Sequence, residues 1–161
     1  MKSFTLLLMS TLAVTCSSII PKAPKPTKAT NYQINFDSID WIKTDPRESD
    51  HVWVQNKTGE VIVVNSFCGE FQSLPLESLA LKTFDSYDSF KPLGKNSTQW
   101  QEREAFEMEA EAKIDGVIVL INLRNYRRDH CYYDFILVTP RNRNLESYRT
   151  FQTLLSRVRF Q

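Results

Sequence analysis

Three cysteines and two histidines are the side chains of this 161-residue sequence best suited to nucleophilic, redox or metal chemistry. Cys16 lies near the N-terminus, Cys68 and Cys131 lie in the body of the chain, and His130 directly precedes the last of them. A thiolate beside an imidazole can act as a nucleophile or a redox centre. Two cysteines in an exported chain more often form a disulfide. The cellular location of the protein, and the elements that position these residues, decide between a reactive thiolate and a disulfide.

The first 15 residues have the composition of a signal peptide. Lys2 supplies one positive charge, and residues 4–14 form an uncharged, mostly apolar run. This run is shorter than the roughly 20 residues that a membrane-spanning helix needs. A positive charge followed by a short apolar run is typical of a cleavable export signal. We therefore predict a signal peptide over 1–15 and an exported protein.

Residues 12–16, Leu-Ala-Val-Thr-Cys, resemble the lipobox of bacterial lipoproteins. In that family the cysteine receives fatty-acyl chains such as palmitate and becomes the new N-terminus. The sequence departs from the family at Ala13, where Leu is preferred, and at Thr15, where Gly, Ala or Ser is preferred. We predict lipidation of Cys16 and anchoring to a membrane of the bacterial envelope, on its periplasmic or cell-surface side. Ordinary signal-peptidase cleavage, giving a secreted soluble protein, and a retained anchor helix are the alternatives.

A tether and a single domain follow the leader. Residues 21–31 contain three prolines and three lysines, a composition typical of an extended, solvated linker. We assign 16–31 to the lipid-attachment cysteine and this tether, and 32–161 to one α+β domain. A chain of that length can bury one hydrophobic core.

Composition and motifs argue against several classes of function. Removal of the leader takes away Lys2 and no acidic residue, which leaves 19 basic and 19 acidic residues. A neutral chain lacks the basic surface of a nucleic-acid-binding protein, so no nucleic-acid partner is expected. The sequence contains no G-x-S-x-G, H-E-x-x-H, G-x-G-x-x-G or phosphate-loop motif. We predict no catalytic residue, no cofactor and no metal site, and so a protein that is not an enzyme.

Apolar periodicity in the first half of the domain predicts strands followed by a helix. Gly59 ends the tripeptide Lys57-Thr58-Gly59, which suits a hairpin turn between two apolar stretches. Pro92 and Gly94 interrupt a later polar stretch and indicate a connection. The predicted elements are a strand at 32–36, a β-hairpin formed by 51–56 and 60–67, a helix at about 74–88 and a polar connection at 85–98.

Residues 105–114 show a conflict between propensity and periodicity. Glu, Ala, Met and Lys favour a helix, but apolar and charged residues alternate here with a period of two. Asp115-Gly116 is a two-residue turn signal, and the apolar run 117–123 follows it. A hairpin that pairs Ile114 with Val117 accommodates both observations.

This register explains why acidic and basic residues are segregated along the chain. It places Glu107 opposite Arg124, and Glu104 opposite Arg127 if the pairing extends that far. Cross-strand pairs of opposite charge contribute roughly 0.2–1 kcal/mol each. The acidic block is therefore interpreted as part of a paired sheet surface and not as a ligand patch.

A strand at 131–139 and an amphipathic helix from Asn144 to Val158 complete the domain. The order β-β-β-α-β-β-β-α with antiparallel hairpins indicates the α+β class. We expect a central antiparallel sheet of about six strands with two helices packed on it.

The element order resembles that of the PsbP-like superfamily, which includes small bacterial envelope lipoproteins. The resemblance covers residues 32–160. It depends also on 112–117 leading into an apolar strand, on 131–134 opening the next, and on 151–160 closing the chain. It implies an α/β/α sandwich and a non-enzymatic binding or assembly factor, with no catalytic residues to carry over.

Cys68 and Cys131 are predicted to form a disulfide in an oxidising compartment. Such a bond closes a loop of about 60 residues and stabilises the fold by about 4 kcal/mol in the chain-entropy model. Two buried free thiols, or reactive or metal-binding thiols, are the alternatives. Neighbours in a strand point to opposite faces, so His130 cannot form a dyad with Cys131. A zinc site that adds His51 lacks any closely spaced ligand pair.

Tyrosine and arginine residues in the last third of the chain are candidates for an interaction surface, because these residue types anchor protein interfaces. Packing in the core or on the sheet is the alternative for each of them. The candidates are Tyr126, Arg127, Arg128, Tyr132 and Arg149.

Three functions follow from these features. The first is a non-enzymatic cell-envelope lipoprotein that binds an envelope protein or component through a sheet face or edge, with the membrane contacted through its N-terminal lipid. The second is a small periplasmic enzyme or thiol-redox protein that uses Cys131 and His130. The third is a carrier of a small apolar ligand held between sheet and helix.

Overall fold

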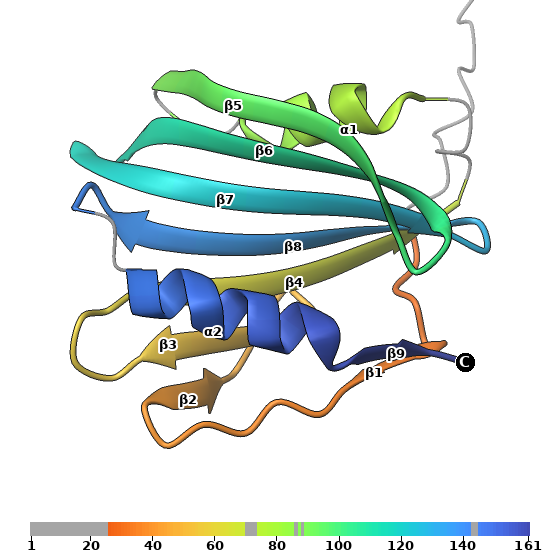
Figure 1. The fold of residues 1–161 in the computed structure, drawn as a ribbon, viewed down its shortest axis with the longest axis horizontal. Coiled ribbons are helices and arrows are strands. Elements are labelled where there is room, and N and C mark those ends of the chain that lie inside the picture. Colours follow the sequence, from red (N-terminus) through yellow and green to blue (C-terminus); the bar gives the residue numbers. More distant parts are fainter. Residues whose placement is uncertain (1–25, 70–73, 86, 88, 143–144) are drawn as a thin grey trace, which may run out of the picture.

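The computed structural model describes residues 26–69, 74–85, 87, 89–142 and 145–161 (Figure 1). The predicted signal peptide and Cys16 lie outside these residues. The strands are β1 (Tyr32–Ile34), β2 (Trp41–Thr44), β3 (His51–Gln55), β4 (Val61–Cys68), β5 (Ser89–Trp100), β6 (Arg103–Ile114), β7 (Val117–Arg128), β8 (Cys131–Pro140) and β9 (Val158–Phe160). The helices are α1 (Leu76–Thr83) and α2 (Leu145–Ser156).

Seven of the strands form one antiparallel sheet in the order β2-β3-β4-β8-β7-β6-β5. β1 and β9 pair in a separate two-stranded sheet that joins the two ends of the domain. The prediction of about six strands was therefore too low. None of the helices in the described ranges is long and apolar enough to cross a bilayer.

Both predicted hairpins are present, and each turns around a glycine. Gly59 has a φ of +73° between β3 and β4, and Gly116 has a φ of +83° between β6 and β7. Residues with a Cβ rarely adopt these angles, which explains glycine at both positions. The alternation in β6 thus outweighs the helical propensity of its residues.

The register between β6 and β7 is the predicted one. Ile114 pairs with Val117, and Glu107 lies opposite Arg124. Glu104 does not pair with Arg127, because the ladder between β6 and β7 ends at the pair formed by Ala105 and Tyr126.

The two helices cover opposite faces of the sheet, so the layers are those of an α/β/α sandwich (Figure 1). β8 shows how alternation separates the two cores. Its residues Tyr132 and Ile136 pack with Leu76, Leu79 and Ala80 of α1. Its residues Tyr133, Phe135 and Leu137 pack with Phe151, Leu154 and Leu155 of α2. The near-continuous apolar sequence of β8 reflects burial on both sides.

The main error of the sequence prediction is the connection expected over 85–98, most of which is strand β5. Its first nine residues are exposed, so no alternation of apolar and polar residues marked it. Pro92 and Gly94, which indicated a loop, lie at an irregularity in its pairing with β6. Edge strands tolerate both residues, because one side of the strand makes no ladder.

The helices are shorter than predicted. α1 ends at Thr83 and not near residue 88. Val158, expected in the last helix, is instead a buried residue of β9 paired with Ile34. Its apolar side chain is compatible with a helix or with a strand, and only the pairing of β9 with β1 shows that it is a strand.

The second half of the predicted tether binds to the domain. Thr27 forms an antiparallel bridge with Cys68, and the amide of Ala29 donates a hydrogen bond to Ser66 Oγ over 2.8 Å. Lys28 pairs with Asp50 at 2.9 Å. β3 pairs with β4 only as far as Val64, so the chain here occupies the β4 edge that β3 leaves uncovered. The solvated linker predicted over 21–31 therefore does not include residues 27–29.

Candidate functional site

A disulfide joins Cys68 of β4 to Cys131 of β8, which are direct partners in the ladder. A bonded sulfur is neither a nucleophile nor a metal ligand, so the thiol-redox interpretation loses its free thiolate. The second histidine, His51, packs against Trp53 and Tyr32. Burial, followed by nearby Lys43, lowers the pKa of His51. In the described ranges no cluster of three or more His, Cys, Asp or Glu can hold a metal ion.

The five residues predicted as an interaction surface do not form one surface. Tyr126 and Tyr132 are buried, and they lie in the cores on opposite faces of the sheet. Arg127 donates a hydrogen bond to the carbonyl of Leu74 on the α1 side. Arg128 lies over the ring of Phe160, and Arg149 is on α2. The types of these residues suggested an interface, but the twofold alternation of strands places them apart.

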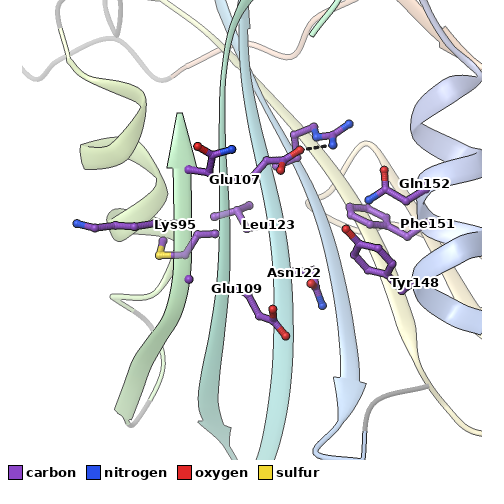
Figure 2. Close-up of a pocket in the computed structure, with 12 residues that line it drawn as sticks. Lys95, Glu107, Glu109, Asn122, Leu123, Tyr148, Phe151 and Gln152 are labelled. Carbon is purple, nitrogen blue, oxygen red and sulfur yellow. Dashed lines mark hydrogen bonds and ion pairs between the residues drawn. The ribbon is translucent and has the colours of Figure 1, made fainter. Parts of the chain in front are cut away.

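A polar trough lies where α2 fails to cover the sheet. α2 crosses β8 and β4 and leaves the same face of β5, β6 and β7 uncovered (Figure 1). The hollow has a volume of about 250 Å³. Figure 2 shows Tyr148 and Gln152 of α2 on one side and Glu107 and Glu109 of β6 on the other. Asn122 of β7 lies between them.

The charges in the trough largely compensate each other. Glu107 accepts an ion-paired hydrogen bond from Arg124, whose guanidinium lies 5.5 Å from the ring centroid of Trp100. Lys95 and Glu109 add one charge of each sign to the lining of the trough. The trough therefore offers donors and acceptors of both kinds without a large net charge. It suits a polar, hydrogen-bonding partner better than a highly charged one.

The outer edge of β5 borders this trough. β5 is the last strand in the order of the sheet, and among the described residues no strand pairs with its outer side. It is 12 residues long, whereas β2 at the opposite edge has four. A long edge strand presents a row of backbone N–H and C=O groups to a partner.

A second cavity, of about 330 Å³, lies on the other face between α1, β4 and β8. Its walls are mostly apolar and include Phe67, Leu79 and Tyr132. The carboxylate of Asp134 also lines it, although this side chain is only 4% exposed. A carboxylate is rarely buried without a cation to pair with.

Asp134 is held by neutral groups. Asn125 Nδ2 donates hydrogen bonds to Asp134 Oδ1 and to the Tyr132 hydroxyl, and Thr83 Oγ1 lies 3.5 Å from Asp134 Oδ2. In the part of the chain that the structure describes, no ion pair involves Asp134. Desolvation raises the pKa of Asp134 to about 7, although the hydrogen bonds from Tyr132, Asn125 and Thr83 oppose the shift.

Sequence reasoning did not single out Asp134. The available signal was its position as the one charged residue of the otherwise uncharged run from Cys131 to Val138, within a predicted strand. A charge inside such a run indicates either an irregularity in the strand or a buried functional group. The sequence indicated the trough less clearly, because its strand residues alternate between apolar and polar as they do in any half-exposed sheet.

No protein-family model and no curated protein matches the sequence of the chain. Solved structures do resemble it. The solution structure of the cyanobacterial PsbP (CyanoP) from Synechocystis superposes with a TM-score of 0.57 at 11% identity, over 85% of this chain and 92% of that one. The fold is PsbP-like.

LpqN, a protein involved in cell envelope biogenesis of Mycobacterium tuberculosis, shares this PsbP-like fold. It superposes with a TM-score of 0.58 at 8% identity, over 86% of each chain. The predicted resemblance is thereby confirmed at the level of the fold. Identities this low establish the PsbP-like fold alone, and function has to be argued from the surface of this chain.

Proposed function

We propose that the protein is an exported, non-enzymatic adaptor of the bacterial envelope that is anchored through Cys16. Its partner is an extended segment of another envelope protein. That segment adds a strand to the outer edge of β5 and places alternate side chains in the polar trough. The observation that carries the proposal is the long outer edge of β5, with which no described strand pairs, beside a hollow of mixed polarity.

Strand addition suits this edge because its affinity comes from backbone hydrogen bonds and its specificity from pockets for alternate side chains. The half of β5 from Lys95 to Trp100 pairs regularly with β6, so its outer side has a regular spacing. The irregularity at Pro92 and Gly94 limits pairing to that half. The chain already uses the same mode at β4, where Thr27 bridges to Cys68.

The anchor leaves β5 free. The N-terminal segment meets the domain at Cys68 of β4, and β8, β7 and β6 separate β4 from β5. A lipid attached upstream of residue 26 therefore restrains a different side of the domain. Envelope location is supported by the signal-like leader and by the fold shared with LpqN, which is involved in envelope biogenesis.

Site-specific photocrosslinking in intact cells tests the proposed edge. A benzoylphenylalanine at Asn96, exposed on β5, is expected to give a higher-mass adduct, whereas one at Ile42 on β2 gives none. A Gln152→Trp change fills the trough and is expected to weaken the adduct at least tenfold. Thr153→Trp is the matched control, because Thr153 is exposed on α2 and does not line the trough.

The captured segment must also bind the purified protein. A synthetic peptide of its sequence is expected to slow backbone amide exchange in β5 and not in β2. Equal adducts at both edges, an adduct insensitive to Gln152→Trp, or unchanged exchange in β5 would contradict strand addition.

The anchor is tested separately. Cys16→Ala is expected to move the protein from the membrane fraction to the soluble periplasmic or secreted fraction, because the acyl chains supply the membrane affinity. Mass spectrometry of the mature wild-type protein should show an acylated cysteine at its N-terminus. An unmodified mature terminus, or a variant that stays in the membrane fraction, would contradict lipidation.

A further inference from the structure

The cavity under α1 is chemically unlike the trough and is not used by the proposed adaptor function. It lies on the opposite face of the sheet, and it is both larger and more apolar. Its volume of about 330 Å³ compares with the roughly 150 Å³ apolar cavity that accepts a benzene molecule. It therefore has room for a small bicyclic or short-chain organic molecule.

The buried charged group in this cavity is the carboxylate of Asp134, which forms no ion pair with any residue that the structure describes. Asp134 lies with its hydrogen-bond partners Asn125 and Thr83 against the apolar walls formed by Phe67 and Leu79. Burial of a charge without a counter-ion is costly. A cationic group bound in the cavity would pair with Asp134 and recover that cost.

We propose that this cavity binds a small organic amine, with its apolar body between Phe67, Leu79 and Tyr132 and its ammonium group on Asp134. The carboxylate is the anchor, and the apolar walls exclude the water that would otherwise compete for the ion pair. Tyr132 stacks with Phe67 at 6.1 Å between ring centroids, and both rings line the cavity. An ammonium group beside such rings gains additional attraction.

Among the described residues, the charged and titratable groups around Asp134 come from its own strand β8, from α1 and the residues after it, and from the N-terminal segment. Lys82 of α1 lines the cavity with an exposed side chain, and Lys28 of the N-terminal segment acts on Asp134 from the β4 edge. Tyr132 of β8 and Tyr87, after α1, face it as phenols whose pKa values burial raises. Lys28 is already engaged with Asp50. The inner part of the cavity is thus anionic and its rim is cationic, so a monoamine is favoured over a diamine.

Three isosteric probes test the charge preference at pH 8. We expect 1-naphthylmethylamine to bind the full-length Cys16→Ala protein at least tenfold more tightly than 1-naphthylmethanol, measured by calorimetry. 1-Naphthoate is the third probe, and it would bind best only if Lys82 and not Asp134 were the anchor. Amine binding is expected to strengthen as the pH rises through about 7, because Asp134 then ionises.

Asp134→Asn is expected to reduce the preference for the amine over the alcohol to less than twofold. Lys82→Gln is the matched control at the rim and should keep or increase the preference. NMR shifts of the Leu79 methyl groups report binding directly, and circular dichroism checks that the variants fold. Equal affinity for amine and alcohol in the wild type, best binding of the carboxylate, a preference that survives in Asp134→Asn, or no binding of the amine at millimolar concentration would overturn the proposal. The strand-addition experiments are unaffected by any of these results.

Discussion

Replacement of both Cys68 and Cys131 by alanine is expected to lower the free energy of unfolding by about 4 kcal/mol, on the entropy scale for a closed loop of this length. The two residues are 63 positions apart, so the bond restricts much of the unfolded chain. It also joins the ends of β4 and β8, two central strands of the sheet. Chemical denaturation of the double variant against the parent protein measures the effect.

The comparison is made in the Cys16→Ala background, so that only one disulfide can form. Reduction of the parent protein is expected to lower its denaturation midpoint toward that of the double variant. The double variant itself should not respond to the reductant. Two titratable thiols in the unreduced, denatured parent protein, or a midpoint unchanged by reduction, would show that the bond does not form or does not stabilise the fold.

The second large effect is a dependence of stability on pH that comes from Asp134. Burial raises the pKa of Asp134 in the folded protein from the ordinary value of 3.8 to about 7. The folded state therefore holds this proton more tightly, and the associated stability is fully present below pH 4 and is lost as the pH rises through about 7. With about 1.4 kcal/mol for each pKa unit, the wild type should lose roughly 2–3 kcal/mol between pH 5 and pH 8 relative to Asp134→Asn.

Denaturation of both proteins across this pH range measures the difference. Asp37→Asn is the control, because Asp37 is exposed and removing its carboxylate removes no buried charge. The carbon chemical shift of the Asp134 carboxyl in the wild type gives an independent titration. A difference between wild type and Asp134→Asn that does not vary with pH, or a carboxyl that titrates near pH 4, would contradict the buried, unpaired state of this group.

The hairpins were predictable because their signals are local. The alternation over 105–114 and the turn at Asp115-Gly116 act within one short segment, and together they determine which residues face each other. The opposition of Glu107 and Arg124 followed from the register alone and is present as an ion pair. The resemblance to the PsbP-like fold also followed from the element order, which such local signals define.

The edges of the sheet were not predictable in this way. β5 is exposed along most of its length, and β2 has only four residues, so neither shows a buried stripe. Both strands exist because a neighbouring strand offers them a ladder. β9 depends in the same way on β1, which lies more than 120 residues earlier in the chain. Pairing partners far apart in the sequence leave no periodic signal in either segment.

Some candidate sites were predictable from residue types alone, and others became visible only in the folded structure. Cysteine chemistry in an exported chain predicted the bond between Cys68 and Cys131, because few other outcomes suit two such residues. The grouping of tyrosines and arginines as one surface failed, since alternate positions of a strand lie on opposite faces. Asp134 could be recognised as a candidate only in the structure, where α1 covers it and the loss of water raises the pKa of its carboxylate.

By itself, the sequence predicted the two hairpins, the cysteine pair and the α+β class, which the structure contains, and it also predicted an export signal, which stays a prediction. Each of these depends on residues that interact through short segments or through a specific chemistry. The tertiary structure decided which edge of the sheet is open, where α2 leaves the trough uncovered and why Asp134 retains its proton near neutral pH. These properties come from burial and solvent exclusion, which arise only when elements distant in the chain pack together.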